Sequence, residues 1–381
     1  MKLSTAKRNW HAAVNRMGSI LVVGLTAVLS WAEPGLRNVD CSKGEMIGEA
    51  LAKADRGDTI RVTGTCRERA TITTDRLTLD GQGTAVLDGA GVARTTDFSG
   101  LLTIDGARGV TVTGFTIQNA PSDGILALHA ATCVVSNTTV QDNALMGIEV
   151  ADLSTAELTD FTTRRNLLGV NVLNESLVIF RGSIIIKDNR GDGLDLFGRS
   201  TADLRGAHVE ASNNAFGLAA INGQLVVHPN IGRGSAITAT NNRVAGIGIG
   251  ASNFDIFATI TVTAENNGFG LFCPAGGKLL DPFGRGTFVF RNNGTGLFFS
   301  AGCLALVNPA MLTVQNNSTG MLADAADTLS FVTNPPNGSA ISGNGTDVDL
   351  RFGTRATIQG ITVGTIVCDG TILSRGSTKC P

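Results

Sequence analysis

An asparagine returns about every 25 residues along most of this 381-residue chain, and a glycine usually follows it three or four positions later. The asparagines are Asn119, Asn143, Asn166, Asn189, Asn214, Asn242, Asn267, Asn293, Asn317 and Asn344. A short apolar segment comes next, as in GIEV, GVNV and GLDL. A unit this small cannot bury its own apolar face and must stack on its neighbours. The repeat therefore predicts a solenoid.

Within each unit, apolar residues alternate with small or polar ones over four to six positions. This is the pattern of a strand with one buried face. Helical periodicity is confined to Ser42–Ala54, so turns and not helices must join the parallel strands. We therefore predict an all-β parallel β-helix of about 10–12 coils, with Ser42–Ala54 as a helix that caps the N-terminal end.

The returning asparagines have a structural interpretation. Asparagine tolerates the left-handed conformation of a sharp turn, and its amide both donates and accepts hydrogen bonds. Coils stacked about 4.8 Å apart would place these amides in a ladder along the solenoid. An inward-facing ladder removes the asparagines from the functional candidates.

The first residues have the composition of an export signal. Four basic residues precede an apolar run from Met17 to Leu29, and Ser30-Trp31-Ala32 resembles a cleavage site. The run is shorter than the roughly 20 residues of a membrane span. We predict a signal peptide over 1–32, no membrane span after its removal, and a secreted or periplasmic protein. The rest divides into a cap at 33–70, repeats at 71–355, and C-terminal strands with a disulfide-closed end at 356–381.

Seven cysteines in an exported chain indicate an oxidising compartment. The candidates for disulfides are Cys41 with Cys66 near one end, Cys368 with Cys380 near the other, and Cys273 with Cys303 at matching points of adjacent repeats. Connectivity cannot be deduced from the sequence. Cys133 is left over and is expected to be a buried free thiol.

The charge and the aromatic content limit the classes of binding partner that the chain can have. Without the leader the chain has 26 basic and 32 acidic residues, which disfavours nucleic acid and anionic membrane surfaces. Trp10 and Trp31 both lie in the leader and the chain has no tyrosine, so phenylalanine is the aromatic residue of the mature protein. Tryptophan and tyrosine combine an aromatic ring with a hydrogen-bonding group, and their absence from the mature protein weighs against a typical sugar-binding cleft.

The segment CSKGEMIGEALAKADRGDTIRVTGTCRERATITTDRLTLDGQG, followed by the Asn-x-x-Gly coils, resembles secreted bacterial right-handed parallel β-helix proteins of the pectin-lyase-like superfamily. The resemblance covers the mature chain and implies a right-handed coil and an extracellular polysaccharide as partner. It fixes no activity, because this fold carries lyases, hydrolases, epimerases and adhesins. The motifs of the polygalacturonases, alginate epimerases and pectate lyases are not recognisable here.

If the coils are in register, one outward position forms a central stripe. Its residues are Leu126, Glu149, Asn171, Asp195, Ala219, Gly248, Phe272, Phe298 and Leu322. Glu149 and Asp195 are candidate catalytic carboxylates, roughly 10 Å apart, a little beyond the spacing of inverting glycosidases. Asn171, Phe272 and Phe298 are candidate binding residues. The alternative is a row of solvated residues on an exposed strand face.

Two further candidates lie near this stripe in the sequence. Asp192 could join Asp195 in a carboxylate pair suited to calcium, although Gly191-Asp192-Gly193 is equally explained as a turn. Arg164 and Lys187 occupy equivalent positions on adjacent coils and could supply the base of a lyase. They do not lie on the stripe. No cofactor is predicted, and calcium is the metal that the carboxylates could take.

The interpretation that the sequence favours is a non-catalytic exported scaffold that presents a surface or associates with polysaccharide. One alternative is a lyase or hydrolase acting on acidic polysaccharide through the central stripe. Another is an adhesive or oligomerising module that uses the apolar outward residues Phe272, Phe298 and Leu322.

Overall fold

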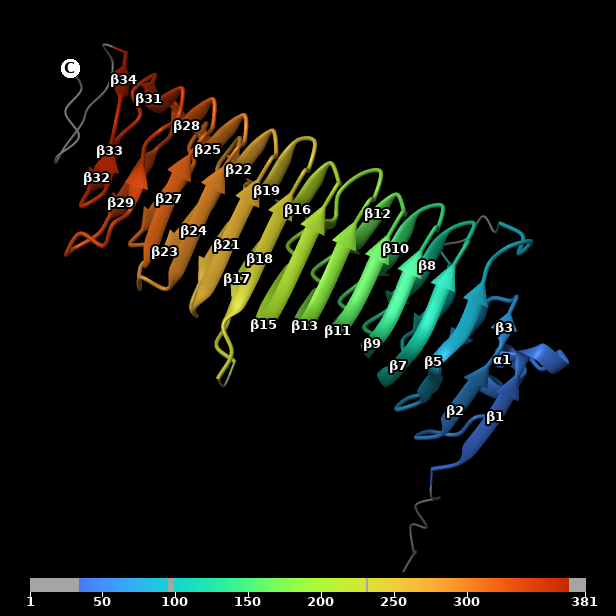
Figure 1. The fold of residues 1–381 in the computed structure, drawn as a ribbon. Helices are drawn as coiled ribbons and strands as arrows, with labels where there is room; N and C mark the ends of the chain where they lie inside the picture. The colour runs from blue at the N-terminus through green and yellow to red at the C-terminus, as the bar shows by residue number, and fades with distance from the viewer. Residues whose placement is uncertain (1–33, 95–98, 231, 370–381) are drawn as a thin grey trace, which may run out of the picture. The chain divides into compact units, whose positions relative to one another are not determined.

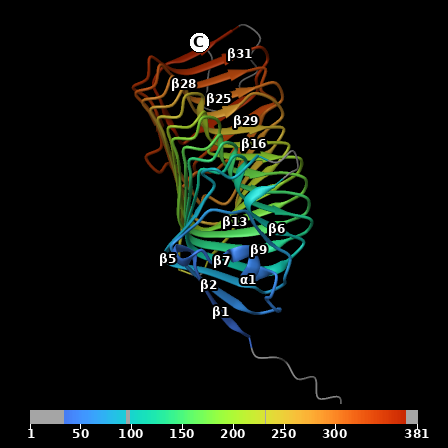
Figure 2. The ribbon, with the colours of Figure 1, turned by 90° about the vertical axis from the view of Figure 1, so that its right-hand side faces the viewer.

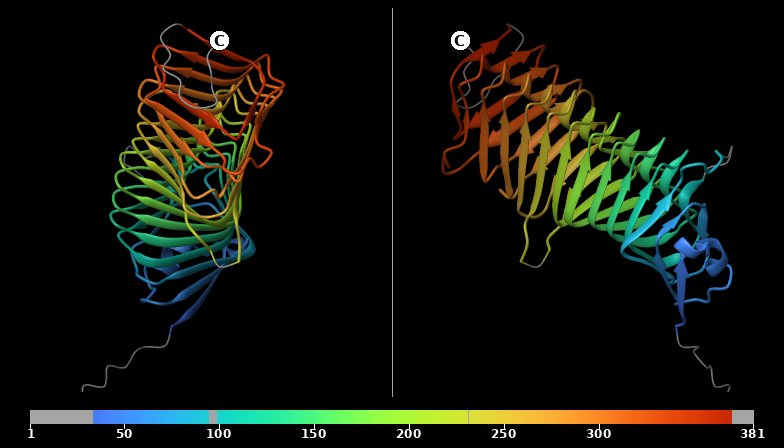
Figure 3. Two further views of the ribbon diagram at one scale, coloured as in Figure 1. Left: turned by 90° about the vertical axis from the view of Figure 1, so that its left-hand side faces the viewer. Right: turned by 45° about the vertical axis from the view of Figure 1, so that its right-hand side comes forward.

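The computed structural model describes residues 34–94, 99–230 and 232–369, and these form a parallel β-helix (Figure 1). Each coil contributes to two sheets, and every pairing between named strands is parallel, as with β11 and β13. Figure 2 and Figure 3 show the coils following one another in sequence order. The predicted signal peptide lies outside the described residues and stays a prediction.

The smaller sheet has 13 strands in the described part of the chain, one per coil. They are β4 (Ala70–Ile72), β6 (Gly100–Asp105), β8 (Asp123–Leu128), β10 (Met146–Val150), β12 (Leu168–Val172), β14 (Leu194–Phe197), β16 (Phe216–Ile221), β19 (Ala245–Gly250), β22 (Phe269–Cys273), β25 (Thr295–Ser300), β28 (Thr319–Asp324), β31 (Thr346–Arg351) and β34 (Ile366–Cys368). The β-helix prediction is confirmed, with about 13 coils where about 10–12 were expected.

The larger sheet has 21 strands among the same residues, because many coils cross it twice or with a bent strand. They are β1 (Leu36–Asp40), β2 (Thr59–Thr63), β3 (Thr65–Cys66), β5 (Thr78–Asp88), β7 (Arg108–Gln118), β9 (Thr132–Gln141), β11 (Thr155–Arg164), β13 (Leu177–Lys187), β15 (Thr201–Ser212), β17 (Gln224–Val227), β18 (Ser235–Thr240), β20 (Asn253–Ile256), β21 (Ile260–Glu265), β23 (Lys278–Asp281), β24 (Gly286–Arg291), β26 (Leu304–Val307), β27 (Met311–Gln315), β29 (Thr328–Val332), β30 (Ala340–Ile341), β32 (Ala356–Gln359) and β33 (Thr362–Val363).

One continuous apolar core fills the coils from Val39 to Ile358. In β13 the inward positions include Val178, Phe180 and Ile184, all fully buried, and partly exposed residues alternate with them. Burying a side chain of this size contributes about 1.5–3 kcal/mol. The apolar positions of the alternating pattern in the sequence are therefore the residues that face the inside of the solenoid.

The asparagine ladder is present and runs from Asn143 to Asn344. At a typical step, the Asn242 backbone N–H and side-chain amide both donate to Asn267 Oδ1, at 2.9 and 3.0 Å. The amide of Asn267 donates in turn to Asn293 Oδ1 at 3.1 Å and to the Ala239 carbonyl at 3.0 Å. The last member, Asn344, donates to Asp347 Oδ1. Each buried amide is thus satisfied by the next coil.

The structure corrects two details of the predicted ladder. Asn119 is not a member, because the backbone N–H of the next residue, Ala120, donates to Asn143 Oδ1. The left-handed residue of the turn is the one before the ladder asparagine, as with Asn266 at φ 58° and Asn292 at φ 56°. In each Asn-Asn pair, the first asparagine therefore adopts the left-handed conformation of the turn, and the second joins the ladder.

The glycine after each ladder asparagine is required by close packing between coils. A Cβ on Gly193 would lie 2.4 Å from the Gly217 carbonyl oxygen and 3.0 Å from Asn214 Nδ2. The same holds for Gly217, where a Cβ would lie 2.5 Å from the Gly246 carbonyl oxygen. The Asn-x-x-Gly spacing therefore encodes the ladder and the space beside it.

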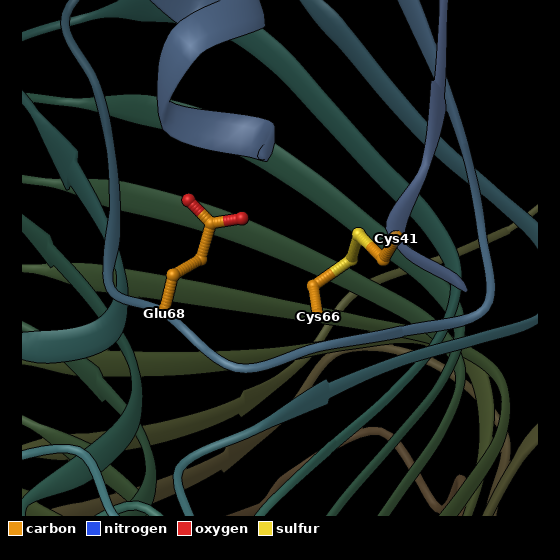
Figure 4. Close-up of side chains that lie close together, drawn as sticks. All are labelled: Cys41, Cys66 and Glu68. Atoms are coloured by element: carbon orange, nitrogen blue, oxygen red, sulfur yellow. A yellow bond between two sulfur atoms is a disulfide. The ribbon is translucent and has the colours of Figure 1, made fainter. Parts of the chain in front are cut away.

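At the N-terminal end, the predicted helix over 42–54 is shorter, because it reduces to a 3-10 turn, η1 (Cys41–Lys43), and α1 (Ile47–Leu51). Ile47 and Leu51 of α1 are buried against the core. The Glu68 carboxylate accepts hydrogen bonds from the Ile47 and Gly48 backbone N–H groups, at 2.7 and 2.9 Å. Figure 4 shows this carboxylate pointing toward α1.

Two predicted disulfides are confirmed, Cys41–Cys66 and Cys273–Cys303. Cys368 is also disulfide-bonded, and its predicted partner Cys380 lies outside the described residues. Cys133 is a buried free thiol, as expected. The first bridge ties the terminal turn η1 to β3, and the second joins adjacent coils.

We predict that Asn267→Ala lowers the free energy of unfolding by roughly 2–4 kcal/mol, because the Asn242 backbone N–H and side-chain amide lose their shared acceptor and the Ala239 carbonyl loses a donor. Asn266→Gly, at the neighbouring left-handed and exposed position, should change it by no more than about 1 kcal/mol. Denaturant unfolding followed by circular dichroism measures both. Equal losses in the two variants would contradict the ladder's role.

Candidate functional site

The central stripe exists in the predicted register. Leu126 pairs with Glu149, Glu149 with Asn171, and Asn171 with Asp195. The stripe continues through Ala219, Gly248, Phe272, Phe298 and Leu322 on successive strands of the smaller sheet. The side chains of this stripe therefore lie on the outer face of one sheet, one residue per coil.

The first half of the stripe is buried, which differs from the exposed strand face considered as an alternative. Glu149 is 2% exposed and Asn171 5%. The cause is a flanking column three positions earlier in each strand: Asp123, Met146, Leu168, Asp192, Phe216, Ala245, Phe269, Thr295 and Thr319. The rings of Phe216 and Phe269 reach the stripe residues of the next coil, Gly248 and Phe298. A Cβ on Gly248, for example, would lie 2.9 Å from the ring of Phe216.

Glu149 has a buried carboxyl group that is only half satisfied. Its Oε2 accepts a hydrogen bond from Asn171 Nδ2 at 2.8 Å, while Oε1 is buried without a hydrogen-bond partner. Burial, followed by the nearby charge of Asp123, raises the pKa of Glu149 to about 7. Burial also raises the pKa of Asp123 to about 6. Burial thus favours the protonated form of both carboxyl groups at this end of the stripe.

Asp195 and Asp192 form a second acidic pair two coils further on. Asp195 is partly buried, and its Oδ1 has no hydrogen-bond partner. Burial and then the charge of Asp192 raise the pKa of Asp195 to about 6. Asp192 Oδ1 accepts from the Phe216 backbone N–H at 3.1 Å, and burial is the main cause of its raised pKa.

A pocket of about 150 Å³ adjoins Asp192 and opens on the outer face. Its lining is mostly apolar: Phe216, Ala219, Ala220, Ile221, Gly248, Ile249, Gly250, Phe272 and Pro274, together with Asp192. The pocket exists because the stripe carries its two smallest side chains, Ala219 and Gly248, between Asp195 and Phe272. Small residues between larger ones leave the floor hollow.

Beyond the pocket, aromatic rings cover the stripe. Phe272 and Phe298 stack with centroids 5.3 Å apart at 15°. Phe269 of the flanking column contacts both, at 4.7 and 5.4 Å. Phe216 lies 6.2 Å from Phe272 across the pocket. Along the stripe, the outer surface therefore passes from carboxylates, past the pocket, to a cluster of phenylalanine rings. We call this surface, made of the stripe, the flanking column and the pocket, the groove.

Charged residues near the groove are mixed, with acidic ones in the majority. Asp152 adds to the negative field at Glu149. Arg243 lowers the pKa of Asp192 against the effect of burial, and its guanidinium donates to the Arg190 carbonyl at 2.9 Å. One arginine thus partly offsets the acidic pair beside the pocket.

Arg164 and Lys187 are neighbours, as predicted, but on the other sheet. They pair between β11 and β13 near the ends of these strands. Arg164 Nε donates to Gln141 Oε1 at 2.8 Å. The structure does not bring this basic pair together with the central stripe.

A calcium site at Asp192 and Asp195 stays a prediction. Calcium takes six to eight oxygen ligands, and two carboxylates supply a minority of them. Within the described ranges, the group of three potential metal-ligating side chains is Cys41, Cys66 and Glu68 (Figure 4). In this group the two cysteines form a disulfide, and the Glu68 carboxylate accepts a hydrogen bond from the backbone of α1. The group therefore has a structural role.

Comparison with known proteins defines the class. The profile of the family described as right handed beta helix region matches residues 99–351. The chain belongs to this family, and the coil is right-handed. No curated protein matches the chain in sequence.

Several solved structures are similar to this chain. A pectate lyase is 14% identical over 77% of this chain and 78% of its own, with a TM-score of 0.46. The A-module of a mannuronan C-5 epimerase from Azotobacter vinelandii is 12% identical over 91% and 90%, with a TM-score of 0.44. An alginate lyase from Paenibacillus sp. is 12% identical over 88% and 98%, with a TM-score of 0.38. No site residue is assigned from likenesses of this size.

Sequence reasoning missed the flanking column. Asp123, Phe216 and Phe269 complete the groove, yet they lie outside the alternating pattern that defined the stripe. The signal was the fixed spacing of three residues before each stripe position, with a glycine next to it in most coils. A second ladder was also missed, in which backbone N–H groups donate to Ser154, Ser176 and Ser200 hydroxyls.

We predict that Glu149→Gln changes how stability depends on pH. The pKa of Glu149 in the folded protein is about 7, above the ordinary value of 4.5. The stability that the protonated carboxyl group contributes is therefore complete below pH about 4.5, and it is lost as the pH rises through about 7. Glutamine does not titrate. As the pH rises between these two values, the free energy of unfolding of the wild type should therefore fall by roughly 3 kcal/mol relative to that of the variant.

Thermal or denaturant unfolding at several pH values measures this difference. Glu210→Gln, which replaces an exposed glutamate on β15, is the control and should follow the wild type. If Glu149→Gln also follows the wild type at every pH, the burial of a neutral acid at this position is contradicted.

Proposed function

We propose that this chain is an exported, non-catalytic glycan-binding protein whose ligand lies in the groove of the smaller sheet. The observation that carries the proposal is the pocket of about 150 Å³ lined by Asp192, Phe216 and Phe272. Ligand pockets are typically concave and mostly apolar, with a few polar groups that fix orientation. The groove has this composition.

The pocket suits a sugar ring for two reasons. Phe216 and Phe272 offer apolar ring surface to the C–H faces of a sugar, without the polar handle of tryptophan or tyrosine. The Asp192 carboxylate lines the pocket as well, and its oxygens can accept hydrogen bonds. Since the coils repeat about every 4.8 Å along the stripe, a polymer lying along it would meet a new side chain at each coil.

Export remains part of the proposal. Disulfides between Cys41 and Cys66 and between Cys273 and Cys303 fit an oxidising compartment. None of the helices in the described part of the chain has the length and apolar character of a membrane span. We propose the signal peptide over 1–32, the cap over 33–70, the repeats over 71–355 and the closing segment over 356–381.

We predict that Phe272→Ala weakens glycan binding about tenfold or more, because it removes one wall of the pocket. Calorimetric titration with an oligosaccharide selected from a glycan array measures the affinity. Phe283→Ala is the matched control, since Phe283 is 62% exposed and does not line the pocket.

A filling variant separates binding from folding. Ala219→Leu places a larger side chain on the pocket floor and should abolish binding, and its unfolding midpoint shows whether the fold is kept. Binding that survives both Phe272→Ala and Ala219→Leu would place the ligand elsewhere. No binding to any array member would contradict the proposal itself.

Glycoside hydrolysis is the second candidate function, favoured by the raised pKa of Glu149 and of Asp195. Their Cα atoms are two coils, roughly 10 Å, apart, and an inverting hydrolase separates acid and base by about 6.5–9.5 Å. Because Glu149 is buried, we prefer glycan binding to hydrolysis as the function. Reducing ends that appear with the wild type and not with Asp195→Asn would establish hydrolysis.

The adhesive alternative rests on Phe272, Phe298 and Leu322. These residues are partly buried, and the two phenylalanines pack against each other and Phe269. Their apolar surface is therefore largely used within the chain. Sedimentation of the purified protein tests this alternative, which requires an oligomer that Phe298→Ala dissolves.

A further inference from the structure

We propose that the turns of three adjacent coils form a second binding site, which takes an uncharged saccharide and recognises its neighbouring hydroxyl groups. A pocket of about 360 Å³ lies there, and we call it the turn pocket. It is lined by Arg199, Thr201, Asn222, Gly223, Gln224, Ala251, Ser252 and Asn253. This inference goes beyond the proposed function, because it concerns other residues and another surface of the coil.

The turn pocket lies where the chain leaves the smaller sheet for the larger one. Its residues belong to the turns that follow β14, β16 and β19 and to the first residues of β15, β17 and β20. Ile221 and Gly250 line the pocket of the groove, whereas the next residues, Asn222 and Ala251, line the turn pocket. The two pockets therefore lie on either side of the same turns.

The hollow follows from the residues at the turn. Arg199, Asn222, Ala251 and Gly276 take the left-handed position on successive coils, at φ 64°, 54°, 48° and 58°. Their side chains become shorter along the solenoid. The volume of the turn pocket lies within the roughly 300–1,000 Å³ that is usual for ligand sites. The turns therefore leave enough space for a small ligand.

Polar groups of the turn pocket are left without partners in the chain. Among the described residues, the side chains of Thr201, Asn222 and Asn253 form no hydrogen bonds. Gln224 Nε2 donates to Asp255 Oδ2 at 2.6 Å, and Asp255 is 6% exposed. This bond holds the amide in place and leaves Gln224 Oε1 as an acceptor. The lining thus offers both donors and acceptors to a ligand.

The spacing and the chemistry of these groups suit a saccharide. Thr201, Gln224 and Asn253 are paired residues of adjacent strands, so their side chains repeat about every 4.8 Å. Amide and hydroxyl groups together donate and accept hydrogen bonds, as sugar hydroxyls do. Two neighbouring hydroxyl groups of one sugar ring can therefore bind the donor and the acceptor of a single amide.

The charges at the turn pocket favour an uncharged ligand. Arg199 is the charged residue of the lining, and its guanidinium donates to Glu175 Oε1. The buried Asp255 already accepts a hydrogen bond from Gln224. Because both charged groups are engaged within the chain, a uronate, a phosphate or an amine gains no strong ion pair here.

Other classes of ligand fit this pocket less well. A nucleobase is held by stacking on aromatic rings, and none of the lining residues has one. An extended peptide needs an open strand edge, but β17 is paired on both sides, with β15 and β20. The lining instead offers hydrogen bonds to hydroxyl groups.

The test uses uncharged hexasaccharides of glucose, mannose and galactose in several linkages, with oligogalacturonate as the charged comparison. Calorimetric titration gives each affinity. We expect an uncharged saccharide to bind, and its affinity to change by less than about twofold when salt is added. Its per-O-methylated counterpart should bind about tenfold more weakly or worse, because methyl ethers cannot donate and leave acceptors of the pocket unpaired.

Asn253→Ala and Asn222→Gly should each weaken this binding about tenfold, because each removes a hydrogen-bonding group of the lining. Neither side chain has a partner among the described residues, and glycine keeps the left-handed turn at position 222. The unfolding midpoints should therefore stay near that of the wild type. Asn308→Ala is the matched control, since Asn308 is exposed and does not line the turn pocket.

Three outcomes overturn the inference. Saccharide binding that Ala219→Leu abolishes and Asn253→Ala spares lies in the groove, so the proposed function stands without a second site. Equal affinity for the methylated ligand excludes recognition through hydroxyl groups. If no uncharged saccharide binds, the inference fails, whereas the proposed function is decided separately by the glycan array and Phe272→Ala.

Discussion

The fold depends on the hydrogen bonds of one asparagine per coil. In water the backbone and amide groups of a turn are solvated, but inside the coil they bind the asparagine of the next coil and a backbone carbonyl, as Asn242 binds Asn267 and Ala211. Each coil is therefore satisfied only when its neighbour is in register. The glycine after each asparagine leaves the space for this contact, which explains why Gly193 and Gly217 cannot carry a Cβ without displacing backbone.

The ladder also positions the groove. Because each turn is anchored by its asparagine, the strand that follows starts at a fixed height, and the residue five or six positions after the asparagine reaches the same place on the outer face. Glu149, Asn171 and Asp195 are aligned for this reason. A buried structural interaction on the inside thus determines which side chains become neighbours on the outside.

The fold and the composition of the stripe could be predicted from the sequence, because register follows from the asparagine spacing and inward positions follow from alternation. The burial of Glu149 could not be predicted. It depends on the flanking column, whose members lie beside the glycine bend where simple alternation fails, so Phe216 covers Gly248 of the next coil. Asn119 was predicted wrongly because the ladder position of its coil is the next residue, Ala120, which donates its backbone N–H but has no side-chain amide to donate.

Function in such a fold is best sought where a column departs from what stacking requires. Stacked positions on a sheet favour small or apolar side chains, which satisfy one another across coils, whereas a buried carboxyl group needs a donor. Glu149 finds one in Asn171 for a single oxygen, and Asp195 Oδ1 has none. The ladder asparagines, by contrast, are fully paired within the chain. The unsatisfied groups of the stripe, and the hollow made by Ala219 and Gly248, are therefore the features of this repeat that stacking does not explain.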